Sequence, residues 1–165
     1  MRIIGIDPGM AIIGYSVLDV TGNDSDTDFA LINSGSIQTD KKNDHASRLF
    51  EIHNDLCELI KNHNPDVAAV EQLFYFKNAK TIIPVAQARG VIIMTLNMFN
   101  IKVFDYTPLV VKQTITGYGR ADKSEIKDMI KIILKQENLT KLDDTADATA
   151  LAICHARQVQ FSNQN

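Results

Sequence analysis

Carboxylates stand in unexpected places in this sequence, first in the segment KLDDTADATALAICHA, residues 141–156. Aspartates suit the first turn of a helix, where they cap free N–H groups and face the positive end of the dipole, which accounts for Asp143 and Asp144. Asp147 lies one turn further in among apolar residues, so we expect it to be buried. A buried carboxylate must pair, lose its charge or bind a cation, and the segment offers no Lys or Arg after its first residue. A cap or a distant salt bridge stays open, but a metal or active-site role is favoured.

Two further carboxylates stand where predicted strands end. Asp7 closes an apolar strand and precedes a Pro-Gly turn, and Glu71 closes the strand VAAV. If these strands are parallel neighbours, both side chains emerge at one sheet edge, where a terminal helix could bring Asp144 and Asp147. Four carboxylates cannot share a small site without cations, because like charges raise one another's pKa. Mg²⁺ prefers oxygen ligands, and two such ions held about 3.5–4 Å apart can clamp the attacking and leaving oxygens of a phosphodiester.

Hydrophobic periodicity predicts the elements that must position these carboxylates. Strand-like patterns occupy residues 1–7, 12–20, 29–39, 67–72 and 101–106. Helical patterns occupy residues 45–63, 78–98, 123–136 and the terminal segment, with a short helix after Pro108. Pro84 either kinks the second helix or marks its true start. Three antiparallel strands followed by alternating helix and strand predict an α/β fold, a five-stranded mixed sheet flanked by helices.

Length and composition set the class of protein. With 165 residues, of which 45% are hydrophobic, the chain fits one globular domain, placed at 1–161 and followed by a disordered tail at 162–165. Cys57 and Cys154 lack CxxC spacing, which favours core thiols in a reduced, intracellular setting. The N-terminus has no signal-peptide pattern, and no apolar stretch reaches the ~18 residues of a membrane span. We therefore expect a cytoplasmic protein with no membrane partner.

Charge is distributed unevenly along the chain. The net charge is −3, yet residues 77–135 hold ten Lys and Arg against four Asp and Glu, whereas the remainder holds seven against sixteen. A basic middle stretch can supply phosphate contacts, so the acidic total does not exclude DNA binding. Four lysines spaced four apart could equally form one solvated helix face: Lys123, Lys127, Lys131 and Lys135.

Two other patterns do not carry the chemistry that they suggest. The run GYGRADKS is not a phosphate-binding P-loop, because Asp122 stands where that loop needs a glycine before its lysine. The four histidines lack the spacing of a metal site, which favours surface or core positions for them: His45, His53, His63 and His155.

Four blocks of the sequence closely resemble the bacterial RuvC family of Holliday junction resolvases: IIGIDPGMAIIGYSV, VEQLFYFKNAKT with QARGV, TPLVVKQTITGYGRADKS and DDTADATALA. GIDPG alone is also similar to the first strand of actin-like ATPases, but the four blocks together are specific and span nearly the whole chain. The resemblance implies a ribonuclease H-like fold and a homodimer that makes paired symmetric nicks in four-way DNA junctions during homologous recombination and DNA repair. It also implies two-metal-ion hydrolysis with two Mg²⁺ per active site, replaceable by Mn²⁺, leaving 5′-phosphate and 3′-hydroxyl ends. A branch-migration complex of the RuvA–RuvB type is the implied partner.

The resemblance assigns roles to particular residues. The metal-binding catalytic set is Asp7, Glu71, Asp144 and Asp147. Asp144 is preferred to Asp143 because the family pattern is an aspartate, two residues, then aspartate-alanine; some members carry histidine at its first position.

DNA contacts also follow from the resemblance. Lys112 and Lys123 match basic residues near the site, although each could be an ordinary exposed charge. Phe74 matches the aromatic residue that stacks on an unpaired base of the opened junction, and a core position is the alternative.

The helix at 79–98 offers the best dimer interface, through apolar and small residues that could instead pack in the core: Ile82, Val85, Ala86, Gly90, Ile93 and Met94. Two other functions stay open. One is a junction-binding protein that has lost catalysis, and the other is a related nuclease acting on RNA or on other branched DNA.

Overall fold

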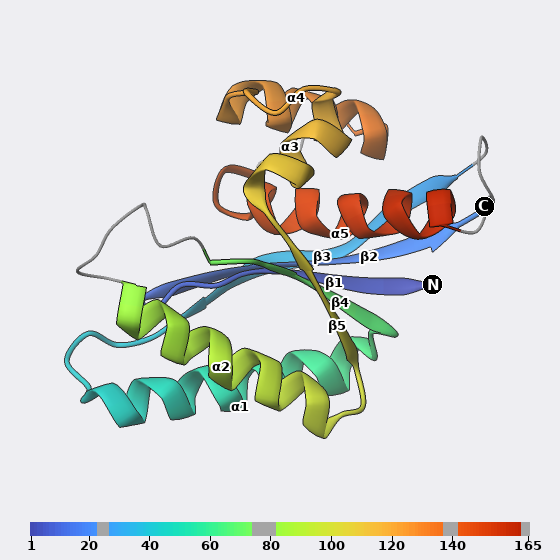
Figure 1. Ribbon diagram of the computed structural model, residues 1–165. Coiled ribbons are helices and arrows are strands. Elements are labelled where there is room, and N and C mark those ends of the chain that lie inside the picture. Colours follow the sequence, from blue (N-terminus) through green and yellow to red (C-terminus); the bar gives the residue numbers. More distant parts are fainter. Residues whose placement is uncertain (23–26, 74–81, 137–141, 163–165) are drawn as a thin grey trace.

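The computed structural model describes residues 1–22, 27–73, 82–136 and 142–162. Five strands form one mixed sheet in the order β3-β2-β1-β4-β5: β1 (Arg2–Asp7), β2 (Ile12–Thr21), β3 (Asp28–Gln38), β4 (Val67–Glu71) and β5 (Lys102–Tyr106). Helices α1 (His45–His63) and α2 (Ile82–Met98) cover one face, while α3 (Pro108–Thr116), α4 (Lys123–Leu134) and α5 (Leu142–Ser162) lie on the other, with α5 directly on the sheet (Figure 1). The predicted α/β fold is confirmed.

The central strands β1 and β4 are nearly continuous apolar runs because helices cover both of their faces. They pair in parallel, as do β4 and β5, whereas β1, β2 and β3 form an antiparallel meander. All three parallel strands therefore end at the same edge of the sheet. This is the edge at which Asp7 and Glu71 stand.

Helix α5 packs unusually close to the sheet at Gly5 in β1. A Cβ atom on Gly5 would lie 2.0 Å from the carbonyl oxygen of Ala148 and 3.0 Å from the backbone nitrogen of Ala152. Alanines on the helix and a glycine on the strand thus let the two backbones touch. Because Asp147 precedes Ala148, this close contact sets how far the aspartate stands from the end of β1.

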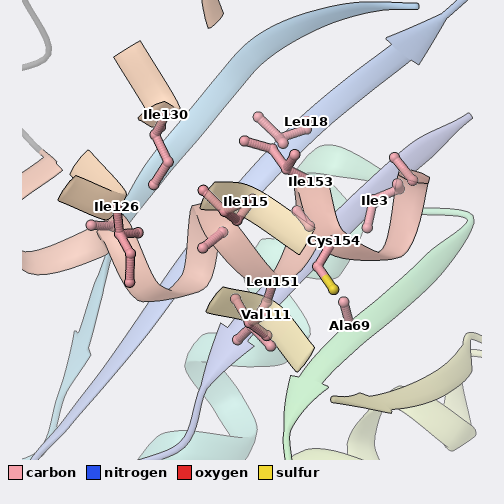
Figure 2. Close-up of a cluster of buried hydrophobic side chains, with 14 of the residues drawn as sticks. Ile3, Leu18, Ala69, Val111, Ile115, Ile126, Ile130, Leu151, Ile153 and Cys154 are labelled. Carbon is pink, nitrogen blue, oxygen red and sulfur yellow. The ribbon is translucent and has the colours of Figure 1, made fainter. Parts of the chain in front are cut away.

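The core around α5 unites the sheet with three helices. Figure 2 shows side chains of the sheet, α3, α4 and α5 meeting there, among them Ile3, Leu18, Ile115, Ile130 and Leu151. Cys154 is buried in this core, as predicted, whereas Cys57 on α1 is only partly buried.

The other face of the sheet carries a second core with α1 and α2. The described part of helix α2 runs from Ile82 to Met98 and includes Pro84. The two predicted readings of Pro84, a kink or the start of the helix, both stay predictions. The predicted residues 78–81 lie outside the described part of the chain.

No helix of the described residues is long and apolar enough to cross a membrane. Helix α5 extends to Ser162, one residue into the predicted tail. The rest of that tail lies outside the described residues.

Candidate active site

Asp7 and Glu71 come together at the carboxyl edge of the sheet. β1 and β4 pair in register up to Ile6 and Val70, so these carboxylates are the next residues of the two strands. A hydrogen bond joins their side chains. Burial raises the pKa of Asp7 above its ordinary value; the hydrogen bond with Glu71 opposes this rise, and the negative charge of Asp147 adds to it. Two carboxyl groups this close must share either a proton or a cation.

Asp147 reaches the same edge from α5, but the prediction that its side chain is buried is wrong. The side chain is 45% exposed, and its carboxylate lies 3.3 Å from Nζ of Lys123 on α4. Its neighbours Ala146 and Ala148 are buried, so the apolar side of the helix packs inward while Asp147 faces a small cavity. An exposed ion pair contributes little to stability, so the contact with Lys123 does not by itself account for this aspartate.

The cavity has a volume of about 40 Å³ and lies between the end of β4, α3 and α5. Glu71, Lys112 and Asp147 supply its charged lining. Nζ of Lys112 donates a hydrogen bond of 2.5 Å to the carbonyl oxygen of Ala121, which holds the lysine beside the carboxylates. The pocket therefore combines two negative groups and one positive group, an arrangement suited to a phosphate with its counter-ion.

Both lysines predicted to contact DNA are thus near the site. The positive charge of Lys123 opposes the rise in the pKa of Asp7, which places Lys123 within electrostatic reach of two of the carboxylates. Lys131 and Lys135, which follow at helical spacing, instead form ion pairs at the surface. Lys123 is itself 81% exposed and Lys135 is 76% exposed, so the solvated helix face that the spacing allowed includes Lys123, which also lies near the carboxylates.

Two predicted site residues fall outside what can be described. Helix α5 includes Asp143 and Asp144 in its first turn, but their side chains lie outside the described part of the structure. Phe74 belongs to residues 74–81, which also lie outside it. The choice of Asp144 over Asp143 and the stacking role of Phe74 stay predictions.

Arg89 on α2 also supports the site, although its role was not predicted from the sequence. Nε of Arg89 donates to the carbonyl oxygen of Glu71 at 3.1 Å, and the guanidinium forms an ion pair with Asp105 at 2.5 Å. Arg89 therefore holds the ends of β4 and β5 from the face opposite α5. Its signal in the sequence is that it is the one charged residue of IIPVAQARGVIIMTLNM, since an isolated charge on an apolar helix needs a partner.

The donor set of this edge fits a hard divalent cation. Asp7, Glu71 and Asp147 offer carboxylate oxygens, which are the ligands that Mg²⁺ and Mn²⁺ take in proteins. Among the described residues, no group of three acidic, histidine or cysteine side chains is arranged to hold a metal ion. The side chain of Asp144 is not among those described. The hydrogen bond between Asp7 and Glu71 is the contact that a shared cation would replace.

Sheet topology and site together define a metal-dependent nuclease with a ribonuclease H-like fold. Residues 3–155 match the family model described as crossover junction endodeoxyribonuclease RuvC. The chain belongs to this family.

Relatives and solved structures agree with this assignment over almost the full length. The chain is 45% identical to the crossover junction endodeoxyribonuclease RuvC of Caldicellulosiruptor saccharolyticus over 155 residues, which cover 94% of this chain and 92% of that protein. It is similar to the RuvC structure of Thermus thermophilus with a TM-score of 0.90 and 28% identity, covering 98% of this chain and 97% of that one. A complex of T. thermophilus RuvC with Holliday junction substrate matches with a TM-score of 0.88 and 27% identity over 98% of this chain and 96% of that one.

Proposed function

We propose that this protein resolves Holliday junctions by making paired symmetric nicks in four-way DNA during homologous recombination and repair. Asp7, Glu71, Asp144 and Asp147 would hold two Mg²⁺ ions. The observation that carries the proposal is the convergence of carboxylates from β1, β4 and α5 at one sheet edge, beside two lysines, in a member of the RuvC family.

Each side chain has a defined task in the proposed reaction. Bound cations would supply Lewis-acid chemistry, namely a water of lowered pKa and charge neutralisation at the phosphate and the departing 3′ oxygen. Asp7 and Glu71 would bind the cations from rigid strand ends, which keeps their carboxylate oxygens in place without reorganisation. Lys112 and Lys123 attract the DNA phosphate and offset the negative charge of the carboxylates. Hydrolysis leaves a 5′-phosphate and a 3′-hydroxyl, the ends that a ligase can join.

One assay separates this function from its alternatives. Purified protein and Mg²⁺ are incubated with a labelled four-way junction, a linear duplex and an RNA–DNA hybrid of matched sequence. We expect symmetric nicks in the junction and little cleavage of the other two. Binding without cleavage would indicate a junction-binding protein that has lost catalysis, and preferential cleavage of the hybrid would indicate a nuclease acting on RNA.

We also propose a homodimer formed through α2. A four-way junction has near two-fold symmetry, so a dimer with a two-fold axis places one active site on each of two opposing strands. The residues of α2 that are buried in the core are Ala88, Ile92, Thr95 and Leu96, and none belongs to the predicted interface. Met94 of that interface is 50% exposed, and its neighbours Ile83 and Met98 are 67% and 62% exposed, so an apolar helix face is left for a second copy.

Met94→Glu should convert the dimer into a monomer, because two like charges would meet across the two-fold axis of a desolvated interface. Sedimentation at micromolar concentration measures the change. The control is Ile132→Glu on α4, which alters a residue that is equally apolar and 68% exposed but lies away from α2. A wild-type protein that is monomeric and still nicks both strands in concert would contradict the dimer.

Phe74→Ala should slow cleavage of an intact junction much more than cleavage of a junction with mismatches at its centre. A side chain stacked on an unpaired base stabilises the opened junction by ~1–3 kcal/mol, and mismatches supply that opening instead. Rates on both substrates are compared, with Phe76→Ala as the control from the same stretch. Equal loss on both substrates, or a large fall in thermal stability, would assign Phe74 to the site scaffold or the core.

The remaining proposals rest on the family resemblance. We propose that a RuvA–RuvB branch-migration complex delivers the junction to this protein, and that both act in the cytoplasm. Mn²⁺ should replace Mg²⁺, since both ions take carboxylate oxygens.

A further inference from the structure

A partly buried hydrogen bond connects the strand next to Glu71 with the helix that carries Asp147. The hydroxyl of Tyr106, the last residue of β5, lies 2.7 Å from Nδ1 of His155 on α5. His155 is 1% exposed. Its ring also packs against Phe104, with the ring centroids 4.3 Å apart. The pair therefore lies between β5 and α5, with the histidine buried and the tyrosine partly buried.

Both partners of this bond are uncharged near neutral pH. Burial raises the pKa of Tyr106 to about 12, and burial followed by the charge of Lys102 lowers the pKa of His155. A neutral hydrogen bond in an apolar setting is well directed and costly to leave unmade. The pair thus acts as a fixed link rather than as an acid or a base.

This hydrogen bond connects the two elements that neighbour or carry two of the proposed metal ligands, Glu71 and Asp147. Tyr106 is the cross-strand partner of Glu71, and its carbonyl oxygen accepts a hydrogen bond of 2.9 Å from the N–H of Gln72. His155 follows Asp147 on the same continuous helix, about 12 Å further along at 1.5 Å per residue. A slide of α5 along its axis would therefore move Asp147 relative to Glu71 and would break the bond between Tyr106 and His155.

Arg89 on α2 supports the same strand ends from the face of the sheet opposite α5. It holds the ends of β4 and β5 together from α2, so that Glu71 and Tyr106 move as one unit. The close contact at Gly5 sets the height of α5 above β1. The bond to His155 adds a directional contact, which apolar packing alone does not provide.

We propose that Tyr106 and His155 are a positioning pair that sets the position of Asp147 relative to Glu71 and so tunes the affinity of the site for divalent cations. The inference rests on the proposed metal-dependent function. Partners that orient ligands from behind typically change metal affinity 10–100-fold when they are removed. For this more distant pair we expect about a ten-fold loss, the lower end of that range.

Binding of Ca²⁺ tests the proposal without any cleavage. A cation that binds only the folded protein raises its Tm with concentration, so Tm is measured over a Ca²⁺ titration for each variant. Tyr106→Phe should need about ten-fold more Ca²⁺ for the same rise. The control is Thr95→Val, which removes a hydrogen bond of 2.8 Å between Thr95 and His53 in the other layer. That variant should lower the starting Tm without moving the titration.

Two variants of His155 test the same proposal if Tyr106→Phe folds poorly. His155→Leu removes the polar atom and should weaken Ca²⁺ binding, whereas His155→Asn keeps a polar atom near the place of Nδ1 and should restore much of it. A titration in Tyr106→Phe and His155→Leu equal to that of the wild type would overturn the positioning role alone. Failure of the wild type to respond to Ca²⁺, or an equal response in Asp7→Asn, would overturn the metal-dependent function and this inference with it.

Discussion

Asp7→Asn, Glu71→Gln and Asp147→Asn should each lower the rate of junction nicking by at least about a hundredfold, the scale on which one lost stabilising group at a reaction centre lowers kcat. Each change removes a charged ligand while keeping nearly the same shape. Junction binding should stay largely intact, because these carboxylates would hold the cations rather than the fold. Nicking is measured in Mg²⁺, and binding is measured in Ca²⁺, whose looser geometry favours binding over cleavage.

The matched control is Asp128→Asn, which removes one negative charge from α4, where Asp128 pairs only with Lys131 among the contacts described for it. Its nicking rate should equal that of the wild type. Near-normal cleavage by any of the three site variants would remove that residue from the catalytic set.

Stability provides a second check on Asp7. Because burial raises the pKa of this carboxyl in the folded state, the protonated form is favoured at low pH and stability is lost as the pH rises through the folded-state pKa. Asparagine is uncharged and does not lose stability in this way as the pH rises. The free energy of unfolding of Asp7→Asn in metal-free buffer at neutral pH should therefore equal or exceed that of the wild type, and a marked fall would show that Asp7 stabilises the fold rather than the cation.

Gly5→Ala is expected to remove both stability and activity. The new Cβ would lie 2.0 Å from the carbonyl oxygen of Ala148, and two backbones must separate to make room for it. Overpacking of this kind costs about 1–3 kcal/mol and sometimes more, and the shift of α5 carries Asp147 away from Asp7. Thermal unfolding and junction nicking are both measured.

The control for this change is Gly90→Ala on α2, where a Cβ meets no atom within 4 Å in a single chain. Since Gly90 belongs to the proposed dimer interface, the unfolding of both variants is compared in the monomeric Met94→Glu background. Alanine should leave stability unchanged or raise it there, because glycine is unfavourable inside a helix by about 1 kcal/mol. A Gly5→Ala protein as stable and active as the wild type would contradict the close packing of α5 on β1.

The sequence predicted the fold well because its patterns were strong. The central strands are short, apolar and bounded by turns, and the register of β1 with β4 then brings Asp7 and Glu71 together without further information. The start of α2 is less clear from the sequence, because apolar residues stand on both sides of Pro84, and the residues before Ile82 lie outside the described part of the chain.

The errors and omissions at the site have a common physical origin. Residue types around Asp147 correctly indicate a buried helix, but they do not show which side chain faces the cavity at the sheet edge. Arg89, Tyr106 and His155 act through contacts between elements far apart in the sequence. Spacing alone predicted a surface or core position for His155, and the structure shows that it is buried. Gly5 did carry a signal, since glycine inside a strand often marks the close approach of another backbone.

The most direct test of the central claim is the anomalous scattering of Mn²⁺ in crystals of the wild-type protein. Two peaks about 3.5–4 Å apart are expected at the carboxyl edge of the sheet, within coordinating distance of Asp7, Glu71 and Asp147, with the side chain of Asp144 completing the set. Crystals of Asp7→Asn grown under the same conditions should lose at least one peak. Peaks located elsewhere, or a site at this edge that stays without Mn²⁺ when the wild-type protein actively nicks junctions in the same buffer, would contradict the account.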